Sequence, residues 1–390
     1  MSAPAPSHVV VVGSGLAGFG VLRELRRLSP EAKLTLVTME DGHFYSKPAL
    51  STALAKEKTA DTLVTTHAAK MATQLKLDLR AGRAVESIDA VGKVVCTTGG
   101  PIGYDALVLA LGADPIRLSL AGDAAHRPIS VNNLEDYRLF RARLTPTARI
   151  LIMGAGLVGT EFANDLAAAG HKPIVVDMLP HPLGRLAPPE VGERIREALA
   201  AEGVSWRLGR KIVALHDQNG ATRADLDDGS SIEADIVLSA VGLRPHTQLA
   251  AEAGLAVGAG VKVDATGRTS DPFIYAIGDC AEYEHGLAAY ITPIMAAARA
   301  IAPSALGAPT PIRFPPLSVQ VKTTFYPTVI LPAPIGVTGS WDRLEADENG
   351  LKYVFRDSAS AICGYVLTQH KCEERIEMDR ALGDKNRKTA

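Results

Sequence analysis

Near its amino terminus the chain reads His8-Val9-Val10-Val11-Val12-Gly13-Ser14-Gly15-Leu16-Ala17-Gly18. The valine run is β-branched and apolar, which is typical of a strand buried on both faces of a parallel sheet. Leucines then recur at helical spacing up to Leu28, and Ser29-Pro30 ends the helix. A second apolar run, residues 34–37, leads to Glu40. This order of strand, glycine turn, helix, strand and acid predicts a dinucleotide-binding unit.

The same order returns later in the chain. A strand over residues 149–153 meets Gly154-Ala155-Gly156-Leu157-Val158-Gly159, and a helix follows that ends at Gly170. Residues 174–176 then form an apolar run that leads to Asp177. A single Gly-x-Gly-x-x-Gly match is a weak signal, but two matches that each lie between a strand and a helix indicate two dinucleotide sites.

A second repeat lies downstream of each unit. Asp105–Gly112 runs on to Pro115, and Asp235–Gly242 runs on to Pro245, with Asp, Gly and Pro at identical offsets. Glycine-containing turns precede both segments, which predicts a hairpin that feeds a strand returning to the core. The duplication predicts an α/β fold with two homologous Rossmann-like domains.

The remainder of the chain predicts a third, smaller domain. A helix is expected over about 293–301, followed by a proline-rich connection over 303–316. Four short strands are expected in a small α+β domain: Val319–Lys322, Thr328–Leu331, Tyr353–Arg356 and Ile362–Leu367. The expected boundaries are 1–118 with 246–318 for the first domain, 119–245 for the second and 319–390 for the third.

Composition narrows the classes of function. The 390 residues carry 41 lysines and arginines against 43 acids, a net charge of −2, which argues against a general nucleic-acid or membrane-surface role. The longest uncharged apolar stretch, residues 9–22, is shorter than the roughly 20 residues of a membrane helix. Four cysteines form no dense framework and no signal peptide is recognisable, so a cytoplasmic location is expected.

The three glycines of each motif have separate roles. The first makes a tight bend, the second lets a pyrophosphate approach the backbone, and the third lets helix and strand pack closely. An acid at the end of the second strand accepts hydrogen bonds from ribose hydroxyls, as expected for Glu40 and Asp177, the alternative for either being a solvated strand end. NAD is favoured over NADP, but His181 and Arg185 leave some tolerance of the phosphorylated form open.

Further motifs carry a resemblance. With Leu107–Gly112 and the two glycine turns, Tyr275-Ala-Ile-Gly278-Asp279 resembles the two-dinucleotide flavoprotein fold of the glutathione reductase class. Tyr45-Ser46-Lys47-Pro48-Ala49-Leu50-Ser51 is similar to a Tyr-x-Arg/Lys-Pro-x-Leu-Ser segment of flavin-dependent ferredoxin and rubredoxin reductases. Glu161-Phe-Ala-Asn-Asp165 and Ser239–Pro245 extend the resemblance to most of the chain, which is weakest beyond residue 303.

The resemblance implies FAD on the first unit and NADH on the second. The implied FAD contacts are Gly13, Gly15, Leu16, Ala17, Gly18, Glu40, Lys47, Pro48, Ala110, Gly112, Asp279 and Lys322. The implied NAD contacts are Gly154, Gly156, Gly159, Glu161, Asp177 and Gly242.

For four of these residues the resemblance implies which part of the cofactor they contact. Asp279 would accept from a ribityl hydroxyl, the alternative being an ordinary helix N-cap, and Lys47 would lie beside the flavin or pyrophosphate, the alternative being a solvated loop lysine. Glu161, expected in the first turn of its helix, would accept from the nicotinamide carboxamide, or simply favour the helix N-terminus. Lys322 matches a lysine directed toward the flavin. Some relatives carry a lysine directly after the Leu-Ser pair, where this chain has Thr52.

The placement of cysteines limits the reaction. Disulfide reductases of this fold need a Cys-x-x-x-x-Cys pair, and peroxide- or coenzyme-A-disulfide-reducing relatives need one reactive cysteine, soon after the first unit. Residues 41–60 contain neither. Cys280 is expected to be a small buried thiol, and the spacing of Cys363 and Cys372 fits neither a zinc site nor a redox pair. Electrons must then leave the flavin directly.

The favoured expectation is therefore an NADH-dependent, FAD-containing reductase that serves rubredoxin, an acidic iron carrier protein, one electron at a time. It needs no metal site and no acid–base side chain, because hydride transfer depends on geometry and electrostatics. A ferredoxin reductase of an oxygenase system or an NADH oxidase is the alternative. A redox-sensing interaction protein is a third, which the near-neutral charge disfavours. A monomer is expected for docking a small carrier.

Overall fold

The computed structural model describes residues 8–288, 290–316, 318–334 and 336–388. The chain divides into two compact units. Unit 1 comprises residues within 1–47, 64–114 and 244–317, and unit 2 comprises residues within 48–63, 115–243 and 318–390. The short strands β10 (Ala113–Pro115) and β18 (Leu243–Pro245) pair where the chain passes between units. The expected division into three domains stays a prediction.

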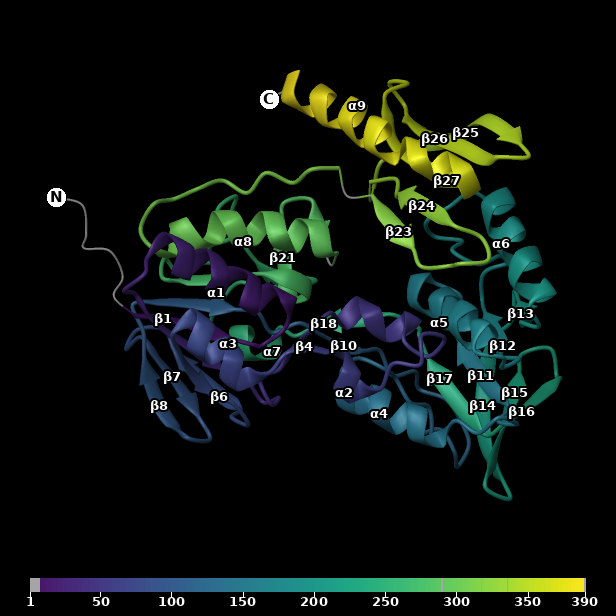
Figure 1. The fold of residues 1–390 in the computed structure, drawn as a ribbon, viewed down its shortest axis with the longest axis horizontal. Helices are drawn as coiled ribbons and strands as arrows, with labels where there is room; N and C mark the ends of the chain where they lie inside the picture. Colours follow the sequence, from purple (N-terminus) through teal and green to yellow (C-terminus); the bar gives the residue numbers. More distant parts are fainter. Residues whose placement is uncertain (1–7, 289, 317, 335, 389–390) are drawn as a thin grey trace. The chain divides into compact units, whose positions relative to one another are not determined.

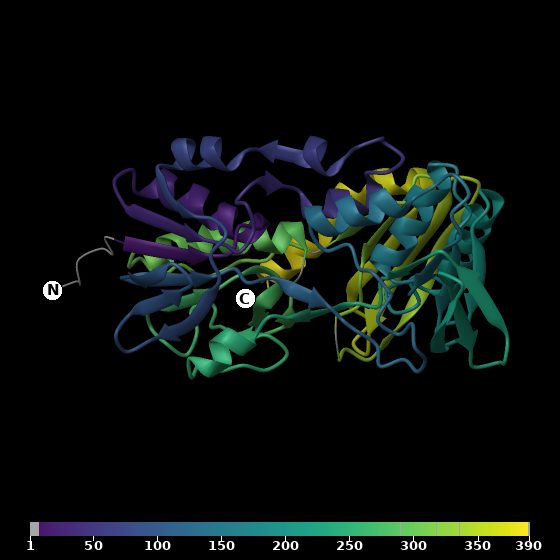
Figure 2. The ribbon, with the colours of Figure 1, turned by 90° about the horizontal axis from the view of Figure 1, so that it is seen from below.

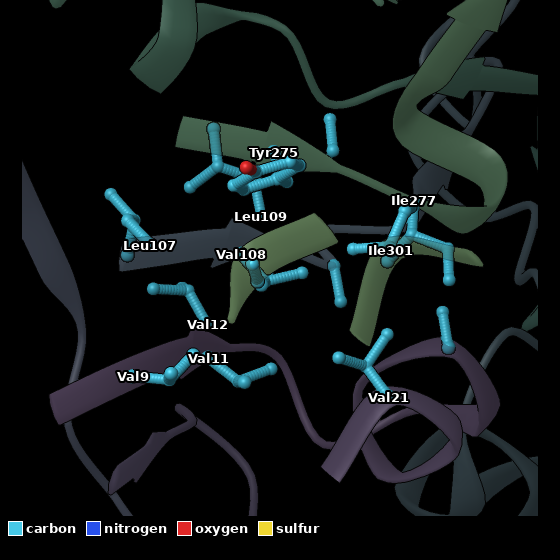
Figure 3. Close-up of a cluster of buried hydrophobic side chains, with 14 of the residues drawn as sticks. Val9, Val11, Val12, Val21, Leu107, Val108, Leu109, Tyr275, Ile277 and Ile301 are labelled. Carbon is cyan, nitrogen blue, oxygen red and sulfur yellow. The ribbon is translucent and has the colours of Figure 1, made fainter. Parts of the chain in front are cut away.

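Unit 1 is built on a five-stranded parallel sheet. Its order is β20 (Ile274–Ala276), β9 (Ala106–Leu109), β1 (His8–Val12), β2 (Lys33–Val37) and β5 (Leu77–Arg80). Figure 3 shows valines of β1 packed beside Leu107, Val108 and Leu109 of β9, and these side chains are almost completely buried. The strand predicted from the valine run is confirmed, with Val12 registered against Val37.

Two helices of unit 1 pack against each other, α1 (Leu16–Leu28) and α8 (Ile291–Ala305), as Figure 1 shows. The proline-rich connection was expected to begin at Pro303, which was wrong, since α8 continues through it. Proline removes one helix hydrogen bond, but the flanking Ala302 and Ala305 are buried in the core, and their packing sustains the last turn.

The remaining elements of unit 1 surround this sheet. The hairpin predicted before Asp105 is the antiparallel sheet β6-β7-β8. The bounds of these elements are β3 (Phe44–Tyr45), β4 (Val64–Thr66), α3 (Ala68–Leu75), β6 (Val85–Asp89), β7 (Val94–Thr97), β8 (Gly100–Gly103), α7 (Gln248–Glu252), β19 (Val261–Lys262), η2 (Gly278–Cys280), β21 (Ala281–Tyr283) and β22 (Gly286–Leu287).

Unit 2 contains the second parallel sheet, in the order β13 (Ser205–Leu208), β12 (Ile174–Asp177), β11 (Ile150–Met153) and β17 (Ile236–Ser239). The second hairpin is the antiparallel sheet β14-β15-β16. The other bounds are η1 (Lys47–Thr52), α2 (Ala60–Leu63), α4 (Leu134–Arg143), α5 (Leu157–Ala168), α6 (Pro189–Ala201), β14 (Ile212–Gln218), β15 (Ala221–Leu226) and β16 (Ser231–Ala234).

The last segment of unit 2 is an antiparallel sheet followed by a helix. Its order is β23 (Val319–Val321), β24 (Thr328–Leu331), β27 (Ile362–Thr368), β26 (Gly350–Asp357) and β25 (Gly339–Asp347), with η3 (Gln369–Glu374) and α9 (Arg375–Lys388) after it. Figure 2 shows these strands in yellow-green. All four predicted strands are confirmed. The edge strand β25 and helix α9 were not predicted, because β25 is largely exposed and both sequences are strongly polar.

The described helices include none that is both long and apolar enough to cross a membrane.

Candidate functional site

The glycine turn of unit 1 is shaped by the chain's own packing. Gly13 has φ +108°, and a Cβ there would lie 2.2 Å from the carbonyl oxygen of Ala110. A Cβ on Gly18 would lie 1.9 Å from the carbonyl oxygen of Gly13. A Cβ on Gly15 would meet nothing within 4 Å. The first and third glycines are therefore required by the fold, whereas the second borders open space.

Unit 2 repeats this arrangement. Gly154 has φ +101°, and its added Cβ would lie 2.6 Å from the carbonyl oxygen of Ala240. A Cβ on Gly159 would lie 1.9 Å from the carbonyl oxygen of Gly154, while one on Gly156 would meet nothing within 4 Å. In both units the second glycine is the N-cap of the helix, so no N-cap side chain covers the first helix amides. Two such cradles fit the pyrophosphates of two dinucleotides.

The two acids do not occupy equivalent positions in the duplicated units. The amide of Gly13 donates to the carbonyl of Val37, and the amide of Gly154 donates to the carbonyl of Val176, both at 2.8 Å. Counting onward from these matched valines, Asp177 corresponds to Thr38, and Glu40 corresponds to Leu179. The sequence pattern treats Glu40 and Asp177 as the same element of a repeat, and the strand register separates them by two residues.

The matched residues Thr38 and Asp177 support the glycine turns of their units in different ways. In unit 2, Asp177 accepts from the amide of Ala155 at 2.6 Å through one carboxylate oxygen and from Leu179 at 2.7 Å through the other. In unit 1, the Thr38 hydroxyl lies 2.8 Å from that of Ser14. Asp177 is thus a support of the turn as well as the expected ribose acceptor, while Glu40 is exposed at the edge of its turn.

Asp279 is brought next to the first turn of α1. The preceding Gly278 has φ +79°, and its added Cβ would lie 2.8 Å from the Ala17 side chain, so the approach requires glycine. Lys47 Nζ lies 3.9 Å from an Asp279 carboxylate oxygen, and the two side chains are 36% and 20% exposed. The N-cap alternative for Asp279 is wrong, because it lies inside η2 and Tyr290 is the N-cap of α8.

Three further predicted contacts lie at the ends of the returning strands. Ala110 is buried and donates its amide to the carbonyl of Val12 at 2.8 Å, which places it against the turn of unit 1. Gly112 has φ +73° with open space around it, and the corresponding Gly242 in unit 2 has φ +114°. Leu16 is the first residue of α1.

Helix α5 of unit 2 carries a buried carboxylate that forms an ion pair. Glu161 is 1% exposed, and one carboxylate oxygen accepts from Lys322 Nζ at 2.5 Å and from the Ser51 hydroxyl at 2.6 Å. The other oxygen accepts from the backbone amide of Lys322 at 3.1 Å. Lys322 Nζ also donates to the carbonyl of Pro48 at 2.8 Å and to the Ser51 hydroxyl at 2.9 Å.

This pair corrects the expected place of Glu161 and adds a cation that the sequence did not predict. Glu161 lies beyond the first turn of α5, which begins at Leu157, and its carboxylate is turned to Ser51 and Lys322, so the helix-terminus alternative is wrong. A cation beside the Leu-Ser pair is also present although Thr52 is not a lysine, because Lys322 supplies it. The sequence could not place Lys322 against Ser51, since 271 residues separate them.

Two buried polar residues of α5 were missed as individual site candidates. Asp165 accepts from the amides of Leu54 and Ala55, and burial raises the pKa of its carboxyl. Asn164 accepts from the amide of Phe325. Both belong to the segment Glu161–Asp165, which drew attention only as part of a resemblance. Their spacing from Glu161, three and four residues, was the available signal for one helix face.

The cysteine that directly follows Asp279, Cys280, presents no exposed thiol. Cys280 is buried, and its Sγ donates to the carbonyls of Leu109 and Ile277. Burial raises the pKa of this thiol to about 11, so it stays protonated near neutral pH. The prediction of a small buried thiol is confirmed. Among the described residues no group of three or more His, Cys, Asp or Glu side chains is placed to hold a metal ion.

Comparison with known proteins agrees with this arrangement. Residues 7–302 match the family described as pyridine nucleotide-disulphide oxidoreductase, and residues 311–382 match the rubredoxin binding C-terminal domain. The chain is 41% identical over 375 residues to a rubredoxin-NAD(+) reductase of Alcanivorax borkumensis, covering 96% of this chain and 98% of that one. It is 38% identical over 369 residues to the protein of the same name in Acinetobacter baylyi, covering 92% and 93%.

A solved structure extends the comparison to the fold. The ferredoxin reductase of a Rhodopseudomonas palustris system superposes with a TM-score of 0.87 at 25% identity, covering 95% of this chain and 93% of that one. The doubled Rossmann units and the additional C-terminal α+β segment are therefore a shared architecture. The chain belongs to the pyridine nucleotide-disulphide oxidoreductase family.

Proposed function

We propose that this protein is an NADH-dependent, FAD-containing reductase that passes electrons to rubredoxin one at a time. The observation that carries the proposal is the pair of open glycine turns on one chain. Each lies at the N-terminus of a helix, α1 or α5, that has no capping side chain. When bound, FAD takes two electrons from NADH and releases them singly, which nicotinamide cannot do. The match of residues 311–382 to a rubredoxin binding domain, and the names of its relatives, support the acceptor.

In unit 1 the chain supplies the groups that would hold FAD. The backbone at Gly15 and the amides of α1 would face the pyrophosphate, and Glu40 would accept from the ribose. The Asp279 carboxylate would accept from a ribityl hydroxyl. Lys47, 3.9 Å from that carboxylate, orients it and adds positive charge next to the cofactor.

In unit 2 the chain supplies the groups that would hold NADH. The amides of α5 at Gly156 would face the pyrophosphate, and Asp177 would accept from the ribose with the lone pairs that its two backbone bonds leave available. Glu161 would accept from the carboxamide of the nicotinamide. Lys322 fixes the Glu161 carboxylate in one orientation, since its ammonium and amide donate to both oxygens.

The absence of cysteine from residues 41–60 supports direct transfer to a protein carrier rather than to a disulfide substrate. We further propose that the protein acts as a monomer, which suits the docking of a small carrier, and that it lies in the cytoplasm, as the sparse cysteines lead us to expect.

Steady-state turnover with rubredoxin, ferredoxin and oxygen, compared side by side under NADH, tests the acceptor. We expect the largest kcat/KM with rubredoxin. A ferredoxin reductase is the second candidate, because a ferredoxin reductase shares the fold at 25% identity, and a larger kcat/KM with ferredoxin would favour it. Reduction of rubredoxin no faster than reduction of oxygen would overturn the acceptor assignment.

A further inference from the structure

Helix α5 carries three buried polar side chains on one face: Glu161, Asn164 and Asp165. They are 1%, 3% and 3% exposed. Charged side chains are rarely this buried unless they are paired, so each needs partners that justify its position. All three find those partners in two chain segments, residues 48–63 and 322–325, rather than in the parallel sheet of unit 2.

Asp165 holds the segment that follows the Leu-Ser pair. One carboxylate oxygen accepts from the amide of Leu54 at 2.9 Å and the other from Ala55 at 3.1 Å. Burial raises the pKa of this carboxyl, while the two amides and the nearby charges of Lys56 and Lys322 favour its ionised form. Each amide donates to its own carboxylate oxygen, whereas a carboxamide at this position would offer a single oxygen to both donors.

The far end of residues 48–63 is fixed by α4. The carbonyl of Lys58 accepts from the Tyr137 hydroxyl at 2.9 Å and from Arg141 at 2.7 Å. Arg138 pairs with Asp61 at 2.8 Å. The near end, which carries Ser51, is held instead by the bonds to Asp165 and Lys322.

Asn164 holds the other segment. Its side-chain oxygen accepts from the amide of Phe325 at 3.3 Å, and its nitrogen donates to the Thr324 hydroxyl at 3.1 Å. These residues lie two and three positions after Lys322. One face of α5 therefore holds both segments that contact the Glu161 carboxylate: the segment that carries Ser51 and the segment that carries Lys322.

We propose that Asp165 is a positioning residue for electron transfer from NADH: it fixes residues 54 and 55 so that Ser51 and Lys322 hold the Glu161 carboxylate in one place. Asn164 does the same for the chain after Lys322. This inference rests on the proposed function of Glu161. Asp165 acts through Ser51 and contacts no reacting atom.

The test compares Asp165→Asn with a matched control in the purified flavoprotein. Asp165→Asn keeps the shape of the side chain and leaves one acceptor oxygen for two amides. The control is Asp227→Asn, because Asp227 is an exposed carboxylate of unit 2 that also accepts a backbone amide, that of Lys211 at 3.1 Å. Amide hydrogen exchange of peptides covering residues 48–58 reports on positioning without NADH. Stopped-flow reduction of the flavin by NADH reports on its consequence.

For Asp165→Asn we expect exchange at residues 54 and 55 to be about tenfold faster. The limiting rate constant of flavin reduction should fall about 10- to 100-fold, with the apparent Kd for NADH changed less than about threefold. Asp227→Asn should change none of these values. Unchanged exchange, or an unchanged rate constant per bound flavin, would overturn the proposal. A loss of flavin content and melting temperature with a normal rate constant would show a merely structural role and also overturn it.

Asn164→Ala keeps the proposal open to refutation if Asp165→Asn does not fold. Its faster amide exchange should be confined to residues 323–326, and the rate constant of flavin reduction should fall by less than in Asp165→Asn. A normal rate constant would count against a positioning role for Asn164. If the wild-type flavin is not reduced by NADH, the proposed function fails, while the exchange measurements still decide whether α5 fixes the two segments.

Discussion

Replacing Lys322 with methionine should expose the energetic importance of the buried Glu161 carboxylate. The ammonium lies 2.5 Å from a carboxylate oxygen that is buried. At an effective dielectric constant of about 20, two unit charges at this separation attract each other by about 6–7 kcal/mol before desolvation is counted. Breaking one partner out of a buried pair costs about 3–5 kcal/mol in practice. We expect the lower end, about 3 kcal/mol, because the Lys322 side chain is 33% exposed and Ser51 still donates to Glu161.

Without the ammonium, the Glu161 carboxylate is left buried with no charged partner, which is the costly outcome of breaking a buried pair. Chemical denaturation of the wild-type protein and of Lys322→Met at pH 8 measures the loss.

Two variants make this prediction specific. Adding Glu161→Gln to Lys322→Met removes the unpaired charge and should recover most of the loss at pH 8. Lys70→Met, an exposed position on α3, should change the unfolding free energy by less than about 0.5 kcal/mol. A Lys322→Met variant no less stable than Lys70→Met at pH 8 would show that Lys322 does not stabilise the buried carboxylate.

Three more predictions follow from the same structure. Gly156→Ala has open space for its Cβ and should fold normally while weakening NADH binding about tenfold or more, whereas Gly159→Ala, whose Cβ would lie 1.9 Å from a carbonyl oxygen, should lose stability as well; equal melting temperatures for the two would contradict this. Cys280→Ala should cost about 1 kcal/mol of stability and leave rubredoxin turnover within about twofold, and a large loss of turnover at normal stability would point to a redox role for the thiol. Rubredoxin reduction should slow as ionic strength rises, because steering of an acidic carrier is screened by salt, and a flat profile in steady-state assays would exclude such steering.

The sequence was sufficient for the repeated architecture. The valine run at β1, the glycine turns and the returning strands each carry a local signal that tertiary packing preserves, and the open second glycines lie where the motif predicts. Long-range geometry could not be read in this way. Glu40 and Asp177 were assigned the same role in the repeat, and the strand register places them two residues apart.

The ion pair of Glu161 and Lys322 illustrates the same limit. Each residue was a candidate alone, but their contact depends on how β23 returns the chain to α5, which no local pattern specifies. Asp165 and Asn164 were overlooked because a buried polar residue in a helix has no periodic signature beyond its shared face. The edge strand β25 was missed for the opposite reason, since its exposed, charged sequence resembles a loop.

The most direct test is an anaerobic titration of the purified protein with NADH, followed by visible absorption. We expect a yellow protein with one FAD per chain that is bleached fully by one equivalent of NADH. A colourless protein that cannot take up FAD, or a bound flavin that NADH leaves oxidised, would contradict it.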